Sequence, residues 1–211
     1  MTQVDSKKKS YHHGNLRAAL LEAGEKVLAE KGVEEFTLRG VARAAGVSHA
    51  APAHHFKSVT HFLTEMTIIA FERLRDNLQS AREQVKDRDP QAFIRSAGKG
   101  YFQFAMCNPQ HFRLMFRTNI VDHSDGRVRK IANEAFSELM ILAGRIHKVE
   151  DVMSDPLAKT DVLLLWSIVH GYSHLVLENQ IGGEVAGKDG LSCDEQLMAI
   201  MSRLLLAIVP K

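Results

Sequence analysis

Cysteine is scarce in this chain of 211 residues, which contains only Cys107 and Cys193. The two lie far apart in the sequence, and neither belongs to a CxxC motif. A disulfide-rich secreted fold and a cysteine-based metal site are therefore excluded. We expect two buried thiols in a protein of a reducing compartment.

Long apolar runs are also absent. The longest nearly unbroken one covers residues 162–169, whereas a membrane-spanning helix needs roughly 20 apolar residues. The N-terminal segment MTQVDSKKKSYHHGN is basic but is not followed by the apolar stretch of a signal peptide. These absences favour a soluble cytoplasmic protein that does not contact a membrane.

The chain has little excess charge, because 27 Lys and Arg residues against 25 Asp and Glu residues give a net charge of +2. A general polyanion binder is thereby excluded, and any nucleic-acid surface must be a local patch. Residues 1–57 contain nine basic and six acidic residues, and the remainder contains eighteen and nineteen. Five of the eleven histidines also fall in residues 1–57, so this part is the better candidate for such a patch.

Motifs that indicate enzymatic chemistry are missing as well. The sequence has no glycine-rich phosphate loop, no nucleophile elbow and no HExxH zinc motif. His170 and His174 stand four residues apart, a spacing at which two imidazoles can share a metal ion, but no third ligand is evident. We therefore expect neither an enzyme nor a metal or cofactor site.

Strand signals are nearly absent, because no segment alternates apolar and polar residues over a sustained length. The helical period of 3.6 residues instead recurs from residue 15 to residue 209. We predict an all-α fold with a basic disordered arm at residues 1–10, a helix-turn-helix domain at residues 11–57 and a larger helical domain at residues 58–211. The nine predicted helices cover about residues 15–31, residues 37–46, a very short stretch after Ser48, and residues 58–84, 90–107, 109–117, 126–148, 156–180 and 192–209.

The segment TLRGVARAAGVSHAAPAHHF, residues 37–56, has the spacing of two short helices joined by a tight turn. Thr37 is placed to cap the first helix, Gly46 to form the left-handed turn and Ser48 to cap the second. Pro52 distorts the first turn of the second helix without forbidding it. In a helix-turn-helix the second helix enters the major groove, so its outward side chains must be short or polar.

Residues with suitable side chains or free helix-terminal N–H groups form the predicted DNA-contact set. The set is Lys8, Lys9, Thr37, Arg39, Ser48, His49, Ala50, His54, His55, Lys57 and Ser58. Short helical corners also occur in all-α proteins that bind no DNA. A helical ligand-binding or interaction protein therefore remains the alternative.

Several segments resemble tetracycline-repressor-like (TetR family) bacterial transcriptional regulators. In the DNA-binding domain these are YHHGNLR at residues 11–17, TLRGVARAAGVS at residues 37–48 and HHF at residues 54–56. In the C-terminal domain, residues 108–116 and 165–172 resemble the branch of the family with a Trp-x-x-x-His-Gly signature. The resemblance implies an all-α homodimer that binds a palindromic DNA operator, usually as a repressor, and releases it when a small molecule enters the C-terminal domain.

Two positions depart from the family pattern. Ala53 stands where the family usually has a tyrosine, and Val59 stands where it usually has a lysine. Both usual side chains bind DNA phosphates. The loss of one neutral hydrogen bond to a phosphate costs about 1 kcal/mol. The loss of one cation lowers the salt slope, the slope of log affinity against log salt concentration, by about 0.9 per half-site. Either the affinity for DNA is reduced, or residues 7–9, His55 and Lys57 compensate for the lost contacts. Residues 7–9 themselves are either a solvated arm or a contact in the DNA groove.

The histidines suggest a further hypothesis. Protonation of His49, His54 or His55 near pH 6 would add positive charge at the DNA and strengthen operator binding.

The predicted helix at residues 156–180 has two apolar faces. Such a helix is either central to a large core or shared between its own core and a partner subunit. We expect the second arrangement, with plain core packing as the alternative. The predicted dimer interface consists of Leu164, Ile168, Gly171, Leu175, Leu197, Met201 and Leu204.

Aromatic and polar residues of the C-terminal region are predicted to surround a cavity for a largely apolar small molecule. The predicted lining is Tyr101, Phe104, Phe112, Met115, Phe116, Phe136, Trp166 and His170. Aromatic residues at helical spacing also form ordinary cores, which is the alternative for this set.

Overall fold

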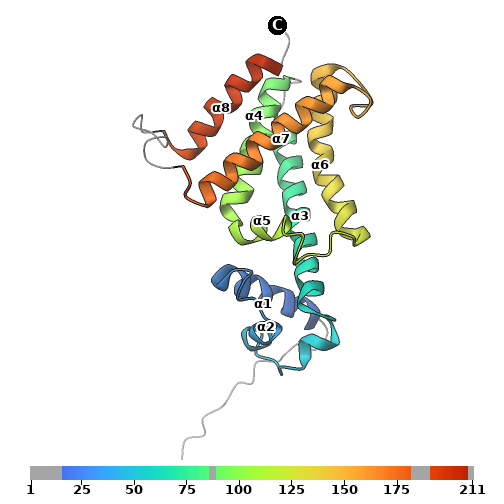
Figure 1. Ribbon diagram of the computed structural model, residues 1–211, viewed down its shortest axis with the longest axis vertical. Helices are drawn as coiled ribbons and strands as arrows, with labels where there is room; N and C mark the ends of the chain where they lie inside the picture. Colours follow the sequence, from blue (N-terminus) through green and yellow to red (C-terminus); the bar gives the residue numbers. More distant parts are fainter. Residues whose placement is uncertain (1–15, 86–88, 182–190, 209–211) are drawn as a thin grey trace, which may run out of the picture. The chain divides into compact units, whose positions relative to one another are not determined.

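The computed structural model describes residues 16–85, 89–181 and 191–208, and within them the chain forms eight α-helices, one 3₁₀ helix and no strand (Figure 1). The predicted all-α class is confirmed. The chain divides into two compact units, Met1–Phe62 and Leu63–Lys211. The division falls inside the helix α3, Val59–Glu83, so one continuous helix belongs to both units.

The first unit contains α1 (Leu16–Lys31), α2 (Leu38–Ala44), the 3₁₀ helix η2 (Ala51–His54) and the start of α3. Its core is built around phenylalanines. The ring centroid of Phe62 lies 4.3 Å from that of Phe56 and 5.4 Å from that of Phe36. Leu20, Leu28 and Val41 complete this core and are fully buried. Burial of these side chains holds α1, α2 and α3 together and fixes the short segment between α2 and α3.

The second unit contains the rest of α3 and five further helices, α4 (Pro90–Cys107), α5 (Pro109–Met115), α6 (Gly126–His147), α7 (Pro156–Leu177) and α8 (Cys193–Ile208). Helix α4 packs against α5, α6, α7 and α8, as Figure 1 shows. One large apolar cluster joins these helices, and a smaller one lies between α6 and α7.

The starts of the helices in the second unit agree with sequence signals. Proline occupies the first position of α4, α5 and α7, where its missing N–H has no partner to lose. Asp89, Asp125 and Asp155 cap α4, α6 and α7, and their side chains accept hydrogen bonds from backbone N–H groups of the first turn.

Some expectations need correction. Helix α5 ends at Met115 and α7 at Leu177, slightly earlier than predicted. Cys107 and Cys193 are both exposed rather than buried, because they stand at a helix C-terminus and a helix N-terminus. Among the described residues no helix is long and apolar enough to cross a membrane. The predicted arm at residues 1–10, with Lys8 and Lys9, lies outside the described residues.

Candidate nucleic-acid interface and ligand cavity

Helix α2 is delimited at both ends by local hydrogen bonds. The Oγ1 of Thr37 accepts the N–H of Gly40 at 3.1 Å, and a Cβ atom at Gly40 would lie 3.1 Å from the same oxygen, so a side chain there would press on the cap. At the other end Gly46 has a φ of 68°. Its N–H bonds to Arg43 O at 3.1 Å, and the N–H of Val47 bonds to Ala42 O at 3.0 Å. This pair is a Schellman motif, which glycine favours.

The element after the turn is a 3₁₀ helix, not the short α-helix that we predicted. Ala51 N–H bonds to Ser48 O at 3.0 Å, Ala53 N–H to Ala50 O at 3.1 Å and His55 N–H to Pro52 O at 3.0 Å. Pro52 has no N–H for an α-helical bond to Ser48 O, so the tighter pattern takes over that acceptor. The side chain of Ser48 accordingly is not seen capping this element.

The segment nevertheless separates polar and apolar side chains as predicted for a groove-facing element. Its outer residues Ser48, His49, Ala50 and His54 are exposed, and His55 is half-buried. On the inner side Ala51, Pro52 and Phe56 are buried. Thr37, Arg39, Lys57 and Ser58 are also exposed. All described members of the predicted DNA-contact set therefore lie at the surface of the first unit, most of them fully exposed.

Phe56 anchors this surface from inside. Its side chain is 1% exposed, and the guanidinium of Arg17 lies 5.5 Å from its ring centroid. This arrangement is a cation–π contact, and it ties the end of the 3₁₀ segment to α1.

The N-terminus of α3 carries a reciprocal cap that sequence analysis did not identify. Ser58 Oγ accepts the N–H of His61 at 3.0 Å, and His61 Nδ1 accepts the N–H of Lys57 at 3.1 Å. The spacing Ser-x-x-His resembles the capping box Ser-x-x-Glu, which is the signal that was missed. One backbone N–H before α3 is therefore occupied within the protein and does not face a phosphate.

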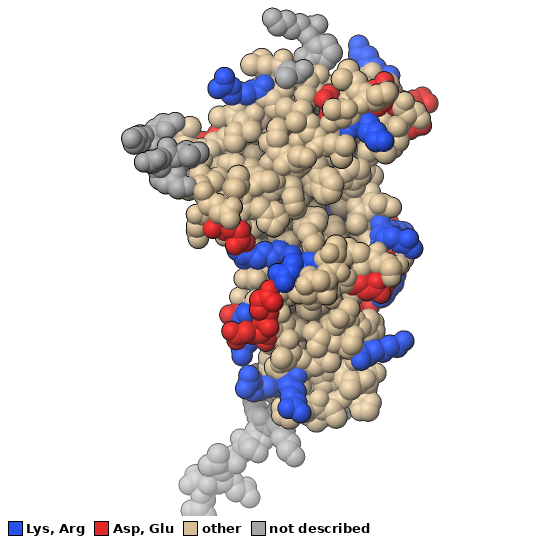
Figure 2. Space-filling model, in the orientation of Figure 1, with Lys and Arg blue, Asp and Glu red and all other residues tan. Residues whose placement is uncertain are grey.

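Exposed cations stand before and after residues 48–55 in the sequence. Arg39, Arg43 and Lys57 are exposed, and Figure 2 shows Lys and Arg side chains on the first unit interspersed with acidic ones. Ala53 is exposed and Val59 is 37% exposed. The two departures from the family pattern thus lie at the surface, where they supply no polar group.

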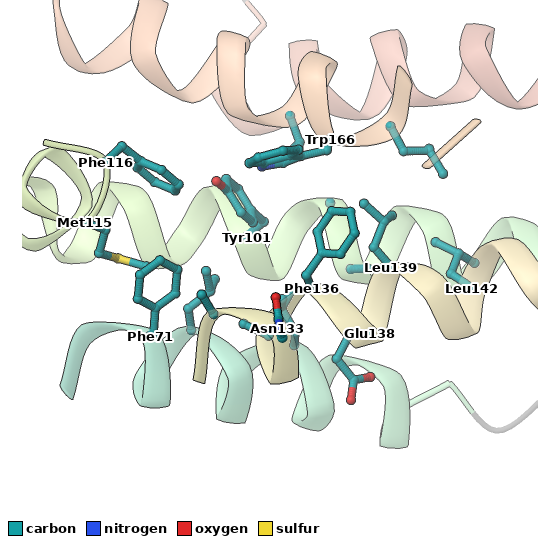
Figure 3. A pocket seen from close by; sticks show the side chains of 18 of the residues that line it. Phe71, Tyr101, Met115, Phe116, Asn133, Phe136, Glu138, Leu139, Leu142 and Trp166 are labelled. Atoms are coloured by element: carbon teal, nitrogen blue, oxygen red, sulfur yellow. The ribbon is translucent and has the colours of Figure 1, made fainter. Parts of the chain in front are cut away.

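The second unit contains a cavity of about 390 Å³. Five of the eight predicted lining residues line it, namely Tyr101, Met115, Phe116, Phe136 and Trp166. Figure 3 shows Tyr101 beside Trp166, with Phe71 near Met115. Lining residues that sequence analysis missed include Phe71, Leu74 and Leu78 of α3, Ile94 and Gly98 of α4, His123 of the α5–α6 segment, and Asn133, Glu138, Leu139 and Leu142 of α6.

Three predicted lining residues do not face the cavity. Phe104 and Phe112 are buried in the core, and the ring of Phe112 packs against those of Tyr101 and His174 at 5.8 and 4.9 Å. His170 stands behind Tyr101, whose hydroxyl lies 2.8 Å from His170 Nδ1.

The environment of His170 favours its neutral form. Burial, together with the neighbouring His174, lowers the pKa of His170 to about 4. Burial also raises the pKa of the Tyr101 hydroxyl, so the pair is uncharged at neutral pH. Tyr101 and His170 therefore form a neutral hydrogen bond that fixes one wall of the cavity.

Glu138 is an acidic residue of the cavity wall that sequence analysis overlooked. It is 4% exposed, and its Oε2 lies 3.3 Å from Arg82 Nε. Burial raises the pKa of Glu138, and the charges of Arg82 and Arg145 together with a hydrogen bond to Gln79 oppose this shift only in part. A carboxylate without full compensation is therefore held inside the unit.

Most of the predicted dimer-interface residues lie at the surface. Leu164 and Leu175 are 38% and 43% exposed, and Ile168, Gly171 and Leu204 are half-buried. The expectation is wrong for Leu197 and Met201, which are buried because they occupy the inner face of α8, and Met201 lines the cavity. Further exposed apolar residues on the two helices are Leu163, Ile200 and Leu206.

The segment between α5 and α6 links the cavity wall to α3 inside the second unit. His123 lines the cavity, and the N–H of its neighbour Asp122 bonds to Thr64 Oγ1 at 3.1 Å. Arg127, in the first turn of α6, forms an ion pair with Glu65 at 2.6 Å. Thr64 and Glu65 are buried residues of α3, so this region of α3 is held to a segment that borders the cavity.

Two family models match the chain. The model described as bacterial regulatory proteins, tetR family, matches residues 20–66, and the one described as tetracyclin repressor-like, C-terminal domain, matches residues 94–199. Among curated proteins, the HTH-type transcriptional regulator Rv1816 of Mycobacterium tuberculosis is 24% identical over 92% of each chain.

Solved structures show the same fold. A protein of unknown function from Rhodococcus sp. RHA1 has a TM-score of 0.80 and 25% identity, and the match covers 96% of this chain and 100% of that chain. The TetR-like regulator LfrR of Mycobacterium smegmatis, solved in complex with proflavine, has a TM-score of 0.58 and 15% identity, covering 92% of this chain and 97% of that chain.

Proposed function

Since the chain belongs to the TetR family of bacterial regulatory proteins and is a DNA-binding transcriptional regulator, we propose that it represses from a palindromic operator and leaves the DNA when a small molecule fills the cavity. The observation that carries this proposal is the pairing of an outward polar segment after Gly46 with an apolar cavity of about 390 Å³ in the other unit. A regulator of this kind acts in the bacterial cytoplasm.

DNA is bound by the surface that includes Arg39, residues 48–55 and Lys57. The exposed histidines and the short side chains of Ser48 and Ala50 face base edges, and the cations face phosphates. Lys8 and Lys9 add an N-terminal contact in this proposal.

A homodimer presents two such surfaces to successive major-groove turns, which explains why the operator is palindromic. The exposed apolar side chains of α7 and α8 support this assembly, since Leu163, Leu164 and Leu206 are 50%, 38% and 83% exposed. In Figure 2 the face over α7 and α8 carries few charged side chains. Gly171 allows close approach, because an added Cβ there would meet nothing within 4 Å.

The effector is a small, largely apolar molecule that occupies the cavity of the second unit. The structure of LfrR in complex with proflavine supports a small-molecule effector, because that relative has the same fold. Ligand contacts with His123 change the position of the segment bonded to Thr64 and Glu65, and α3 carries that change into the first unit. Complete reversal of operator occupancy needs a difference of about 5.5 kcal/mol in ligand affinity between the two states.

The alternative is a helical ligand-binding or interaction protein whose DNA binding is weakened or lost. Exposed Ala53 and Val59 favour it, because neither contributes a phosphate contact. Gel shifts with DNA from upstream of the protein's own gene, and with sites selected from random sequence, decide between the two. We expect a discrete complex with a palindromic footprint, and a failure of all duplexes to bind would establish the alternative.

The dimer is tested by light scattering during gel filtration. Leu164→Glu places a charge on the exposed face of α7 and should yield monomers, whereas Lys159→Glu on the same helix should leave the dimer intact. A wild-type monomer would contradict the proposal.

We also retain the pH hypothesis for the exposed His49 and His54 and the half-buried His55. Operator affinity measured across a salt series should show a steeper log–log slope at pH 6 than at pH 8, because protonated imidazoles release additional counterions. Equal slopes would refute it.

A further inference from the structure

Charge is sparse and of one sign where the polar segment meets α3. Residues 36–64 contain no Asp or Glu, and Lys57 is the only Lys or Arg of residues 44–72. It stands two residues before Val59, where the family pattern has a lysine. The side chain of Lys57 is exposed, and among the described residues its ammonium group takes part in no ion pair. Lys57 is therefore the cation at this end of the DNA surface that can meet a phosphate.

The main chain on both sides of Lys57 is fixed by short-range contacts. Before it, the ring centroid of Phe56 lies 4.3 Å from that of Phe62. After it, Ser58 O accepts the N–H of Phe62 at 3.1 Å. The N–H of Lys57 itself donates to His61 Nδ1 at 3.1 Å. The orientation of the Lys57 backbone between these two anchors thus depends on the imidazole of His61.

His61 is held in place for this bond. Its N–H bonds to Ser58 Oγ at 3.0 Å, and its ring centroid lies 5.9 Å from that of Phe56. These contacts fix both the backbone and the ring, with Nδ1 at the N–H of Lys57. Nδ1 accepts a hydrogen bond only when it carries no proton, so the neutral imidazole has its proton on Nε2.

A fixed backbone matters at Lys57 because the side chain that it carries is long and flexible. Ordering a backbone costs conformational entropy, and a residue that is already ordered in the free protein does not incur this cost when it binds. With the bond to His61 in place, only the side-chain rotamers of Lys57 remain to be ordered on DNA. Without it, the backbone of Lys57 must be ordered as well.

From this geometry we infer that His61 is a positioning residue for DNA binding. Its Nδ1 holds the backbone of Lys57, and Lys57 supplies the phosphate contact that Val59 does not make. His61 acts through Lys57 and does not itself belong to the DNA-contact set. The inference rests on the proposed function in placing the DNA surface at residues 48–57.

Two substitutions separate the acceptor of His61 from its ring. His61→Gln keeps an acceptor, as in the capping box Ser-x-x-Gln, and removes the ring. His61→Phe keeps an aromatic ring beside Phe56 and removes the acceptor. Binding of the full-length protein to a labelled duplex of arbitrary sequence is measured by fluorescence anisotropy across a salt series, because phosphate contacts do not depend on base sequence. All titrations are run at pH 8, which keeps histidine protonation out of the comparison.

Lys57→Ala should weaken binding about fivefold and lower the salt slope by about 0.9 per bound protomer. His61→Phe should reproduce most of both changes, whereas His61→Gln should bind nearly as tightly as wild type. In the Lys57→Ala background, His61→Phe should cause no further loss, because two residues that act through one contact are not additive.

A control variant excludes a merely structural role. Val27 is buried in α1 and lies outside the DNA-contact set. Val27→Ala should lower the melting temperature but leave the salt slope unchanged, and thermal melts verify that every variant is folded at the temperature of the titration. Nitrogen NMR of labelled imidazole rings gives a second measurement, in which the His61 proton should be found on Nε2.

The inference is overturned if His61→Phe leaves the salt slope unchanged, if His61→Gln binds as weakly as His61→Phe, if the losses from Lys57→Ala and His61→Phe add, or if Nδ1 of His61 carries a proton. It is equally overturned if Lys57→Ala binds as wild type does, or if no duplex binds at low salt.

The inference and the proposed function fail separately. An additive result for His61 and Lys57 leaves a palindromic footprint and its release by a small molecule intact. Conversely, the predicted pattern for these variants on arbitrary DNA, together with gel shifts that show no palindromic footprint, contradicts the proposed repressor and leaves the role of His61 intact.

Discussion

The two units place their candidate functional residues in opposite ways. In the first unit, His49, His54 and Arg39 point into solvent from a scaffold held by Phe56. In the second, Tyr101 and Trp166 line a cavity among helices whose outer faces carry exposed leucines. Exposed polar side chains on a rigid scaffold are either hydrated or in contact with a partner, so their exposure identifies a candidate polar interface. Exposure does not identify an apolar ligand site, because a cavity wall and an ordinary core are built from the same kinds of side chain.

The largest expected effect tests whether the units depend on separate cores. Phe56→Ala should destabilise the first unit by about 3–5 kcal/mol, since a fully buried ring and its contact with Arg17 are lost. Urea unfolding followed by far-UV circular dichroism should show an early loss of helix that Trp166 fluorescence does not report. Phe112→Ala, in the second unit, should instead shift the Trp166 transition. If Phe56→Ala shifts both signals equally, the units do not unfold separately.

The next effect concerns the buried imidazole of the second unit. The pKa of His170 is lowered from 6.5 to about 4, mainly by burial, so its contribution to stability is complete above pH 6.5 and is lost as the pH falls toward 4. Because the side chain is only half-buried, we expect a loss of about 1–2 kcal/mol over this range. In His170→Gln that part of the loss should disappear from denaturant-derived free energies of unfolding, whereas His49→Gln, exposed in the first unit, should retain it. Identical pH profiles for wild type and His170→Gln would contradict the assignment.

A smaller effect is expected for single cations of the first unit. Arg39→Ala should weaken operator binding by about 1 kcal/mol and lower the salt slope by about 0.9 per half-site, because one phosphate contact is lost. Fluorescence anisotropy across a salt series measures both quantities. Arg203→Ala, which removes an exposed cation from α8, serves as the control. An unchanged slope in Arg39→Ala would remove Arg39 from the DNA-contact set.

The smallest expected effect concerns the buried charge of Glu138 in the second unit. Burial raises the pKa of Glu138. The neutral carboxyl therefore favours the folded state at low pH, and this contribution to the free energy of unfolding is lost as the pH rises through the pKa. Glu138→Gln should therefore match wild type near pH 4 and exceed it at pH 8 by up to about 1 kcal/mol. Thermal melts at the two pH values measure the difference, and Glu134→Gln, which removes a carboxylate paired with Arg75, should not gain stability at pH 8. A variant that is less stable than wild type at pH 8 would show that the pair with Arg82 stabilises the fold.

Sequence alone could predict three features: the starts of the helices, the polar surface of residues 48–55 and the second apolar face of α7. Each depends on local chemistry: aspartate and proline at Asp89-Pro90 and Asp155-Pro156, glycine at the turn, and periodicity along one helix. The family resemblance was confirmed by both family models.

The features that escaped prediction depend on the packing of distant segments. Met201 and Leu164 are both apolar residues at helical spacing, yet one lines a cavity and the other faces solvent. The rotation of each helix against its neighbours decides between these positions, as it does where Met201 of α8 approaches Gly98 of α4. The pair Glu138–Arg82 likewise joins α6 to α3 across more than fifty residues of sequence. The 3₁₀ geometry around Pro52 was missed because two hydrogen-bond patterns of similar energy compete there.

The uninterrupted course of α3 has a mechanical consequence. A helix of 25 residues is about 37 Å long at 1.5 Å per residue. If the C-terminal end of this rod acts as the pivot, a tilt of about 5° displaces its N-terminal end, which belongs to the first unit, by about 3 Å. That is close to the rise of a single base pair, about 3.4 Å, so in the proposed dimer a tilt of a few degrees is enough to move each DNA-contact segment out of register with its groove.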